Sequence, residues 1–222
     1  MKISLQHYLD QYFVSANELC LSAGISPERF VQGVAQNVIP KPSYRVTADA
    51  KLHSCAFGVF DDVSAREGEY FSPANAVWIR QFEQALQRGD EPSQLFAQHY
   101  WSALAQVDAL LRPHSDLFAG DGIDEQPAAS RLTALRGHFL NGVFGVCVVQ
   151  PDNMLQILRK ELSQDALTRL TENGQKRHYR SDERDQLLPI MAIYDQVTMP
   201  FSPPEYLRCS RKRLLDDIRA GW

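Results

Sequence analysis

The chain has 222 residues, of which 44% are hydrophobic and 23% are charged. These fractions are close to those of globular proteins and argue against wholesale disorder, and the length suits one large domain or a small module followed by a larger one. The net charge of −4 gives no electrostatic support for a dedicated nucleic-acid-binding protein, because such domains are usually basic.

Residues 13–46, "FVSANELCLSAGISPERFVQGVAQNVIPKPSYRV", predict two short helices joined by a tight turn. Ser15 and Glu18 form an S-x-x-E capping box at the start of the first helix, and Gly24 permits the positive φ of a helix C-cap. Ser26 caps the second helix, which has a proline at its first position and another proline at its predicted end. Two helices joined in this way make a helix-turn-helix.

The same stretch resembles the N-terminal module of MerR-type regulators. The resemblance rests on "GIS" at residues 24–26, "VIP" at residues 38–40, and "PSYR" at residues 42–45, where those proteins begin a wing. It implies a helix-turn-helix module over residues 1–46, with or without a wing. It also implies a set of DNA contacts, made by Ser26, Arg29, Gln32, Gln36, Tyr44 and Arg45.

The second helix departs from the MerR pattern in its charge. MerR-type recognition helices usually carry an arginine and paired tyrosines where this chain has Val31, Gln32 and Gly33. Residues 1–46 contain four cations and three carboxylates, although binding to DNA phosphates needs several cations. DNA binding is therefore disfavoured, and packing on a neighbour or a protein contact is the other interpretation of this module.

Residues 47–222 are predicted to form a larger, mainly helical domain. "LHSCAFGVF" at residues 52–60 has strand-like composition and can complete a wing. Apolar residues at helical spacing predict one helix from Ser72 to Gly89 and a longer one from Pro92 to Pro113. A stretch rich in Pro, Gly and Asp then predicts a long loop at about residues 112–130.

The segment "LRGHFLNGVFGVCVVQP" at residues 135–151 is apolar and contains three glycines. Gly142 and Gly145 predict a bend or a close approach of another backbone. Beyond it, the pattern predicts two helices before Gly174, and a helix beginning at Ser181 that Pro189 either kinks or delays. A last helix is predicted after the capping motif "SPPE" at residues 202–205.

The four cysteines are far apart and form no CxxC pair, which predicts reduced thiols in a cytoplasmic protein. The N-terminus lacks the apolar core of a signal peptide, and no apolar run is long enough to span a membrane, so no membrane association is expected. His53 and Cys55 are the one closely spaced pair of nitrogen and sulfur ligands of the kind that zinc prefers. Since zinc sites need about four such ligands, no metal site is predicted, and no motif indicates a cofactor.

Three segments are together similar to a bacterial family of unknown function associated with natural-product biosynthesis. They are "GISPERF…IPKPSYRV" at the N-terminus, "HFLNGVFGVCV" in the centre and "FSPPEYLRCSRKRLL" near the C-terminus. The resemblance implies a role in or beside a biosynthetic pathway. It supplies no catalytic residues.

His138, Asn141 and Cys147 are the candidates for catalysis, because a Cys–His catalyst needs an imidazole within hydrogen-bond reach of the sulfur. His138 and Cys147 are nine residues apart, which is about 30 Å along a strand, so only a helix or a bend can bring them together. Cysteine is also among the most buried residue types, and a core position for Cys147 is the competing interpretation. A basic run forms a second candidate site, for an anion or a partner, or else a solvated helix face: Arg208, Arg211, Lys212 and Arg213.

From the sequence we therefore expect a mainly α protein that acts in natural-product biosynthesis. We expect its helical domain to bind a small molecule, a peptide or a protein partner. Whether it is an enzyme stays open. The alternative is a MerR-like transcriptional regulator, usually a homodimer on DNA, with a C-terminal ligand-sensing domain.

Overall fold

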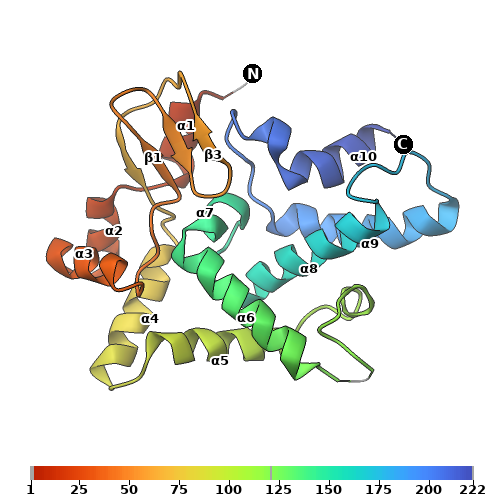
Figure 1. The fold of residues 1–222 in the computed structure, drawn as a ribbon, viewed down its shortest axis with the longest axis horizontal. Helices are drawn as coiled ribbons and strands as arrows, with labels where there is room; N and C mark the ends of the chain where they lie inside the picture. The colour runs from red at the N-terminus through yellow and green to blue at the C-terminus, as the bar shows by residue number, and fades with distance from the viewer. Residues whose placement is uncertain (1–2, 121, 222) are drawn as a thin grey trace.

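The computed structural model describes residues 3–120 and 122–221 (Figure 1). The described chain is mostly helical and carries one small sheet. Its helices are α1 (Leu5–Tyr12), α2 (Ala16–Ala23), α3 (Pro27–Ala35), α4 (Asn75–Gln87), α5 (Pro92–Ala105), α6 (Glu125–Leu140), α7 (Val143–Cys147), α8 (Met154–Leu170), α9 (Ser181–Val197) and α10 (Asp217–Ala220). The strands are β1 (Tyr44–Val46), β2 (Leu52–Ser54), β3 (Gly58–Phe60) and β4 (Gly68–Tyr70), and the short helical turns are η1 (Arg112–His114), η2 (Tyr206–Arg208) and η3 (Lys212–Asp216).

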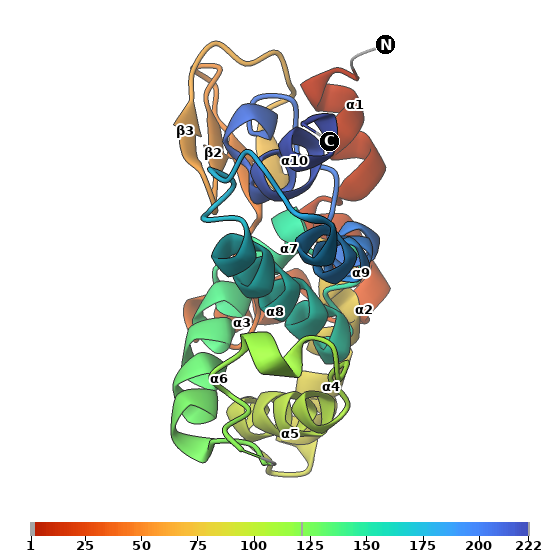
Figure 2. The same cartoon turned by 90° about the vertical axis from the view of Figure 1, so that its right-hand side faces the viewer.

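The sheet and α1 lie at one end of the molecule, α4 and α5 lie at the opposite end, and α6 and α8 lie between them (Figures 1 and 2). Helix α10 lies at the same end of the molecule as the sheet (Figures 1 and 2). No helix within the described part of the chain is both long and apolar enough to cross a membrane.

Helices α2 and α3 lie where their capping signals predict them. The Ser15 backbone N–H donates to Glu18 Oε2 at 2.8 Å, and the Glu18 N–H donates to Ser15 Oγ at 3.3 Å, which completes the capping box. Gly24 ends α2 with φ of 72°, in the left-handed region that glycine enters without strain. The assignment of these two helices as a MerR-like helix-turn-helix stays a prediction.

The strands are antiparallel and lie in the order β3-β2-β1-β4. Strand β1 ends at Val46 and pairs with β2 on one side and β4 on the other. The sheet therefore runs across the predicted division between residues 46 and 47. Three-residue strands show too little alternation to be found reliably from a pattern, and β4 was not predicted.

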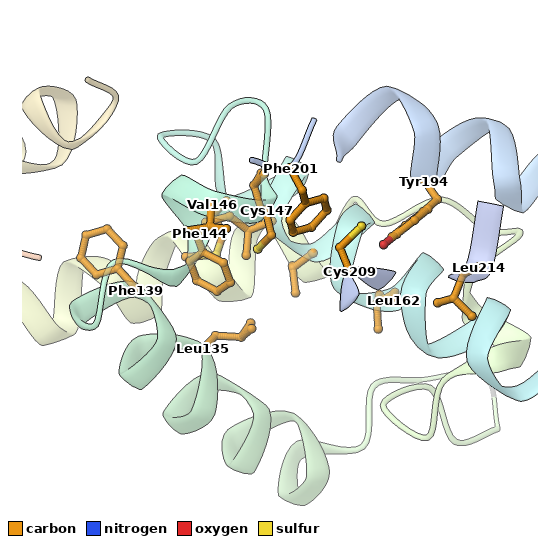
Figure 3. Close-up of a cluster of buried hydrophobic side chains, with 14 of the residues drawn as sticks. Leu135, Phe139, Phe144, Val146, Cys147, Leu162, Tyr194, Phe201, Cys209 and Leu214 are labelled. Atoms are coloured by element: carbon orange, nitrogen blue, oxygen red, sulfur yellow. The ribbon is translucent and has the colours of Figure 1, made fainter. Parts of the chain in front are cut away.

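Two hydrophobic clusters organise the interior. The smaller one lies beneath α2, α3 and α4 and includes Leu19, Phe30 and Ile79. The larger one joins Tyr8 of α1 and Tyr44 of β1 to the helices of the C-terminal half. Part of it is shown in Figure 3, where side chains of α6, α7, α8 and α9 meet. The N-terminal elements and the later helices thus share one core.

The glycine-rich turn after α6 confirms the predicted close approach of another backbone. Gly142 has φ of 78°, and a Cβ atom added there would lie 2.6 Å from the carbonyl oxygen of Lys41. The Ser43 hydroxyl donates to the Gly142 carbonyl oxygen at 2.8 Å. Residues 41–43 therefore lie directly against the α6–α7 turn, and only glycine fits at the contact.

Several predicted boundaries in the C-terminal half are wrong. Helix α5 ends at Ala105, and α6 begins at Glu125 with Asp124 as its N-cap, so the predicted 112–130 loop is shortened from its C-terminal side. Helix α8 is continuous, because Leu162, Ala166 and Leu167 keep one buried face through the predicted break. Pro189 lies inside α9 without ending it. Proline has no N–H to donate to the carbonyl one turn earlier in the helix, but Pro189 is on the exposed face of α9, where water can donate to that carbonyl instead.

The predicted last helix is not one element. The chain forms the 3-10 turn η2, the π-helical turn η3 and then α10. Ser202 and Glu205 do contact each other as the motif predicts, at 2.6 Å between Oγ and Oε2. Glu205 also accepts a bond from a distant tyrosine, which no local pattern can reveal.

Candidate functional site

A groove of about 760 Å³ lies between the sheet and the end of α6; we call it the sheet–α6 groove. Its volume is in the range of small-molecule sites, which is about 300–1,000 Å³. The polar side chains that line it come from both sides: Lys41, Arg45, His53, Ser54, Cys55, Glu69, His138 and Asn141. The first six belong to the sheet region, and the last two belong to α6 and its C-cap.

The sheet wall is formed by a row of side chains across three strands. In β1, Tyr44 and Val46 are buried while Arg45 between them is exposed, as the two-residue period of a strand requires. His53 of β2 and Glu69 of β4 are the residues directly opposite Arg45 in the register. Neighbours opposite each other on paired strands share a face, so this row faces the groove.

The helix wall is formed where α6 ends. His138 lies in the last turn, and Asn141 is the C-cap residue; both are exposed. Lys41 connects this wall to the sheet: its backbone N–H donates to the Leu140 carbonyl at 2.9 Å. Its ammonium group donates to Asn141 Oδ1 at 3.3 Å. The ammonium also lies near the C-terminus of α6, where the helix dipole favours positive charge.

The structure does not bring the three catalytic candidates together. His138 and Asn141 line the groove, but Cys147 is buried in the hydrophobic cluster among Phe144, Phe201 and other side chains (Figure 3). The Cys147 thiol donates to the Val143 carbonyl at 3.3 Å. Burial raises the pKa of this thiol to about 11, so it stays protonated near neutral pH and is a poor nucleophile.

Cys55 is the thiol that lines the groove, and sequence reasoning paired it with His53 as a weak metal motif. The residue is exposed, yet desolvation of its sulfur by the surrounding protein raises the pKa of the thiol, and the nearby Cys147 and Glu205 raise it further. A thiol of this kind carries little thiolate at neutral pH. The described groove therefore contains polar and charged side chains but no activated cysteine.

A buried polar cluster lies on the opposite side of β1, and sequence reasoning missed it. The Tyr44 hydroxyl donates to Glu205 Oε2 at 2.6 Å, and the Ser202 hydroxyl donates to the same oxygen at 2.6 Å. Neither Tyr44 nor Glu205 is exposed. Burial is the first cause of the raised pKa of both groups. We call these three residues the Tyr44–Glu205 cluster.

The residues predicted to contact DNA are spread over different environments. Ser26 caps α3, and Gln32 and Gln36 are exposed on that helix. Arg29 forms an ion pair with Glu83 of α4 at 2.6 Å. The prediction for Tyr44 is wrong, because its side chain is fully buried. Arg45, the last of the six, lies in the sheet–α6 groove.

The basic run near the C-terminus does not form one free cationic surface. Arg211 pairs with Asp195, and Lys212 pairs with Asp217 at 2.5 Å. The other two have different surroundings: Arg208 lies over the ring of Phe60 at 5.3 Å, and Arg213 packs against Gly174. Because two of the four charges are already neutralised, these residues are a weak candidate for holding an anion together.

No group of three or more His, Cys, Asp or Glu side chains that could hold a metal ion occurs among the described residues. Residues 92–222 match the family model described as "Family of unknown function (DUF6058)". No curated protein and no solved structure matches the chain. The matched region contains the helix wall of the groove, and the sheet wall lies before it in the chain.

Proposed function

Because the chain belongs to DUF6058, a family of unknown function, we propose a function from the geometry of the site: the protein binds a small molecule or a short peptide in the sheet–α6 groove. The observation that carries this proposal is the convergence of polar side chains from β1, β2, β4 and α6 around one concavity. Ligand sites are typically concave and hold a few convergent polar groups.

The position of the groove also supports the proposal. Two of the three segments that resemble the natural-product family line it: residues 41, 42 and 45 belong to the first, and residues 138, 141 and 143 belong to the second. The third segment contacts the opposite face of β1, through the bond between Tyr44 and Glu205. In keeping with that resemblance, we propose that the ligand is an intermediate or product of such a pathway. Catalysis is not part of the proposal, since both nearby thiols have raised pKa values.

A titration of the isotope-labelled full chain with a library of small metabolites and short peptides, followed by NMR, tests this function. We expect at least one compound to shift the signals of His53, Ala56 and His138 together. Ala56 lines the groove, so Ala56→Trp should fill it and abolish the shifts. Ala48→Trp is the matched control, because Ala48 is exposed and is not part of the lining. Shifts that survive Ala56→Trp, or that map elsewhere, would contradict the proposal.

DNA binding through α3 is the second candidate, and the exposure of Gln32 and Gln36 favours it. Against it stand the neutralised Arg29 and the buried Tyr44. Binding to fragments of the gene's own upstream DNA, compared at about 50 and about 200 mM salt, tests it. A regulator would bind selectively, more weakly at the higher salt, and would lose selectivity in Gln32→Ala/Gln36→Ala. Absence of binding at the lower salt would reject this candidate.

A further inference from the structure

The sheet–α6 groove has a charge opposite to that of the whole chain. The chain carries a net charge of −4. The described lining of the groove has two permanent cations, Lys41 and Arg45, against one carboxylate, Glu69. His53 and His138 also line it, and neither side chain carries a negative charge. A concave site lined by one sign of charge concentrates ligands of the opposite sign.

We propose that the ligand of this groove is an anionic metabolite whose carboxylate or phosphate group is bound by Arg45. This inference rests on the proposed function, and it adds the chemical class of the ligand and the residue that selects it. A guanidinium presents parallel N–H donors that match both kinds of anion, which makes arginine the side chain suited to this recognition.

Arg45 differs from three partly buried arginines of the helices. Arg29, Arg159 and Arg131 are each paired with a carboxylate within 3.0 Å. Within the described chain, no carboxylate oxygen lies close enough to the Arg45 guanidinium to form an ion pair, even though Glu69 is opposite Arg45 on β4. Its guanidinium is thus available to a ligand, and its backbone is fixed by pairing on both edges of β1.

Lys41 supplies a second positive group, which is held in place by the helix wall. Asn141 Oδ1 accepts a hydrogen bond from the Lys41 ammonium group at 3.3 Å, which leaves the other ammonium protons for a ligand. The Lys41 N–H also donates to the Leu140 carbonyl, which holds the backbone of residue 41 against the end of α6. The groove therefore has one cation on its sheet wall, Arg45, and a second one, Lys41, held against the end of α6.

A substitution of Glu69 tests the proposal through an expected gain in affinity for an anion. Its carboxylate is the one negative charge in the described lining and lies beside Arg45 in the register, where it repels an incoming anion. Glu69→Gln keeps the size of the side chain and removes the charge. We expect this variant to bind an anion more tightly than the wild type, which a merely structural role for Glu69 would not produce.

The experiment is an NMR titration of the full chain at low salt with pyrophosphate and with citrate, which separate phosphate from carboxylate recognition. We expect at least one of the two to shift groove signals, Arg45→Gln to weaken its binding by about tenfold or more, and Glu69→Gln to strengthen it. The control is Arg177→Gln, because Arg177 is exposed and lies outside the groove; it should leave the affinity unchanged.

The outcomes separate this inference from the proposed function. If neither anion shifts groove signals while a neutral or cationic compound of the library does, the assignment of an anion is overturned and the binding function stands. If no compound of any charge binds in the groove, the proposed function fails, and the inference fails with it. Equal losses in Arg45→Gln and Arg177→Gln would show a general charge effect and would overturn the role of Arg45.

Discussion

The two faces of β1 carry polar residues with opposite roles. On the inner face, Tyr44 is fully buried and donates to Glu205, which is 161 residues away in the chain. On the outer face, the adjacent Arg45 is exposed and has no ion-pair partner in the described structure. A satisfied buried contact fixes the fold, whereas an exposed unpaired charge is free for a ligand. Substitutions on the inner side should therefore change stability, and those on the outer side should change binding.

A substitution of Gly142 should have the largest effect on stability, because this glycine packs directly against the backbone of Lys41 and Pro42, which leads into β1. We expect Gly142→Ala to lower the free energy of unfolding by about 2–5 kcal/mol, from the left-handed φ and from overpacking against the Lys41 carbonyl. Denaturant unfolding measures this difference.

Gly137→Ala is the matched control for this glycine. Gly137 lies within α6, and no atom would lie within 4 Å of an added Cβ. That variant should instead gain about 0.5–1 kcal/mol, because alanine is the better helix former. A loss in Gly142→Ala no larger than about 0.5 kcal/mol would contradict the proposed close contact.

Tyr44→Phe should have the next largest effect. It removes the hydroxyl that donates to Glu205 Oε2, and we expect it to cost about 1–3 kcal/mol, since a buried acceptor loses one of its donors. Tyr12→Phe is the control, because Tyr12 is only partly buried and packs through its ring on Tyr8. Equal stabilities of the two variants in chemical denaturation would show that the Tyr44–Glu205 bond contributes nothing to the fold.

The inner face also shows what sequence reasoning can and cannot reach. The caps of α2 and α3 were predictable because the capping residues lie within three positions of each other, as Ser15 and Glu18 do. Gly142 was predictable as a close approach, because glycine itself is the signal. The backbone that approaches Gly142 is that of Lys41, about a hundred residues earlier in the chain. No local sequence pattern could have identified this partner.

The groove was predicted only in pieces. His138 and Asn141 were singled out for catalysis and Arg45 for DNA contacts, each from its local neighbourhood, whereas the fold places all three around one concavity. Glu69 was missed, because it belongs to a three-residue strand with no detectable period. Cys147 was open to either interpretation, and only the packing in Figure 3 shows that it is buried.

The pH dependence of stability gives a smaller and more specific test of the inner face. Burial raises the pKa of Glu205, so the folded state binds its proton more tightly than the unfolded state does. The resulting stabilisation is fully present below the pKa of an unfolded glutamate, about 4.3, and is lost as the pH rises through the higher folded value. Glu205→Gln cannot titrate.

As the pH rises above about 4.3, the free energy of unfolding of the wild type should therefore fall relative to that of Glu205→Gln. Above the pKa of Glu205 in the folded state, the difference between the two proteins should stay constant. Denaturant midpoints measured at intervals from pH 4 to pH 8 check this. Carboxylates such as Asp108, whose pKa is lowered by Arg159, titrate in both proteins and cancel in the difference. A constant difference across this range would show that Glu205 does not titrate differently in the folded state.

The smallest change in stability is expected on the outer face. Arg45 is exposed and has no ion-pair partner within the described residues, so Arg45→Gln removes no intramolecular ion pair. We expect the free energy of unfolding to stay within about 0.5 kcal/mol of the wild-type value, while anion binding in the groove is weakened by about tenfold or more. The two measurements on the same variant separate the faces of β1. A loss of stability comparable to that of Tyr44→Phe would mean that the Arg45 side chain stabilises the fold and is not available to bind a ligand.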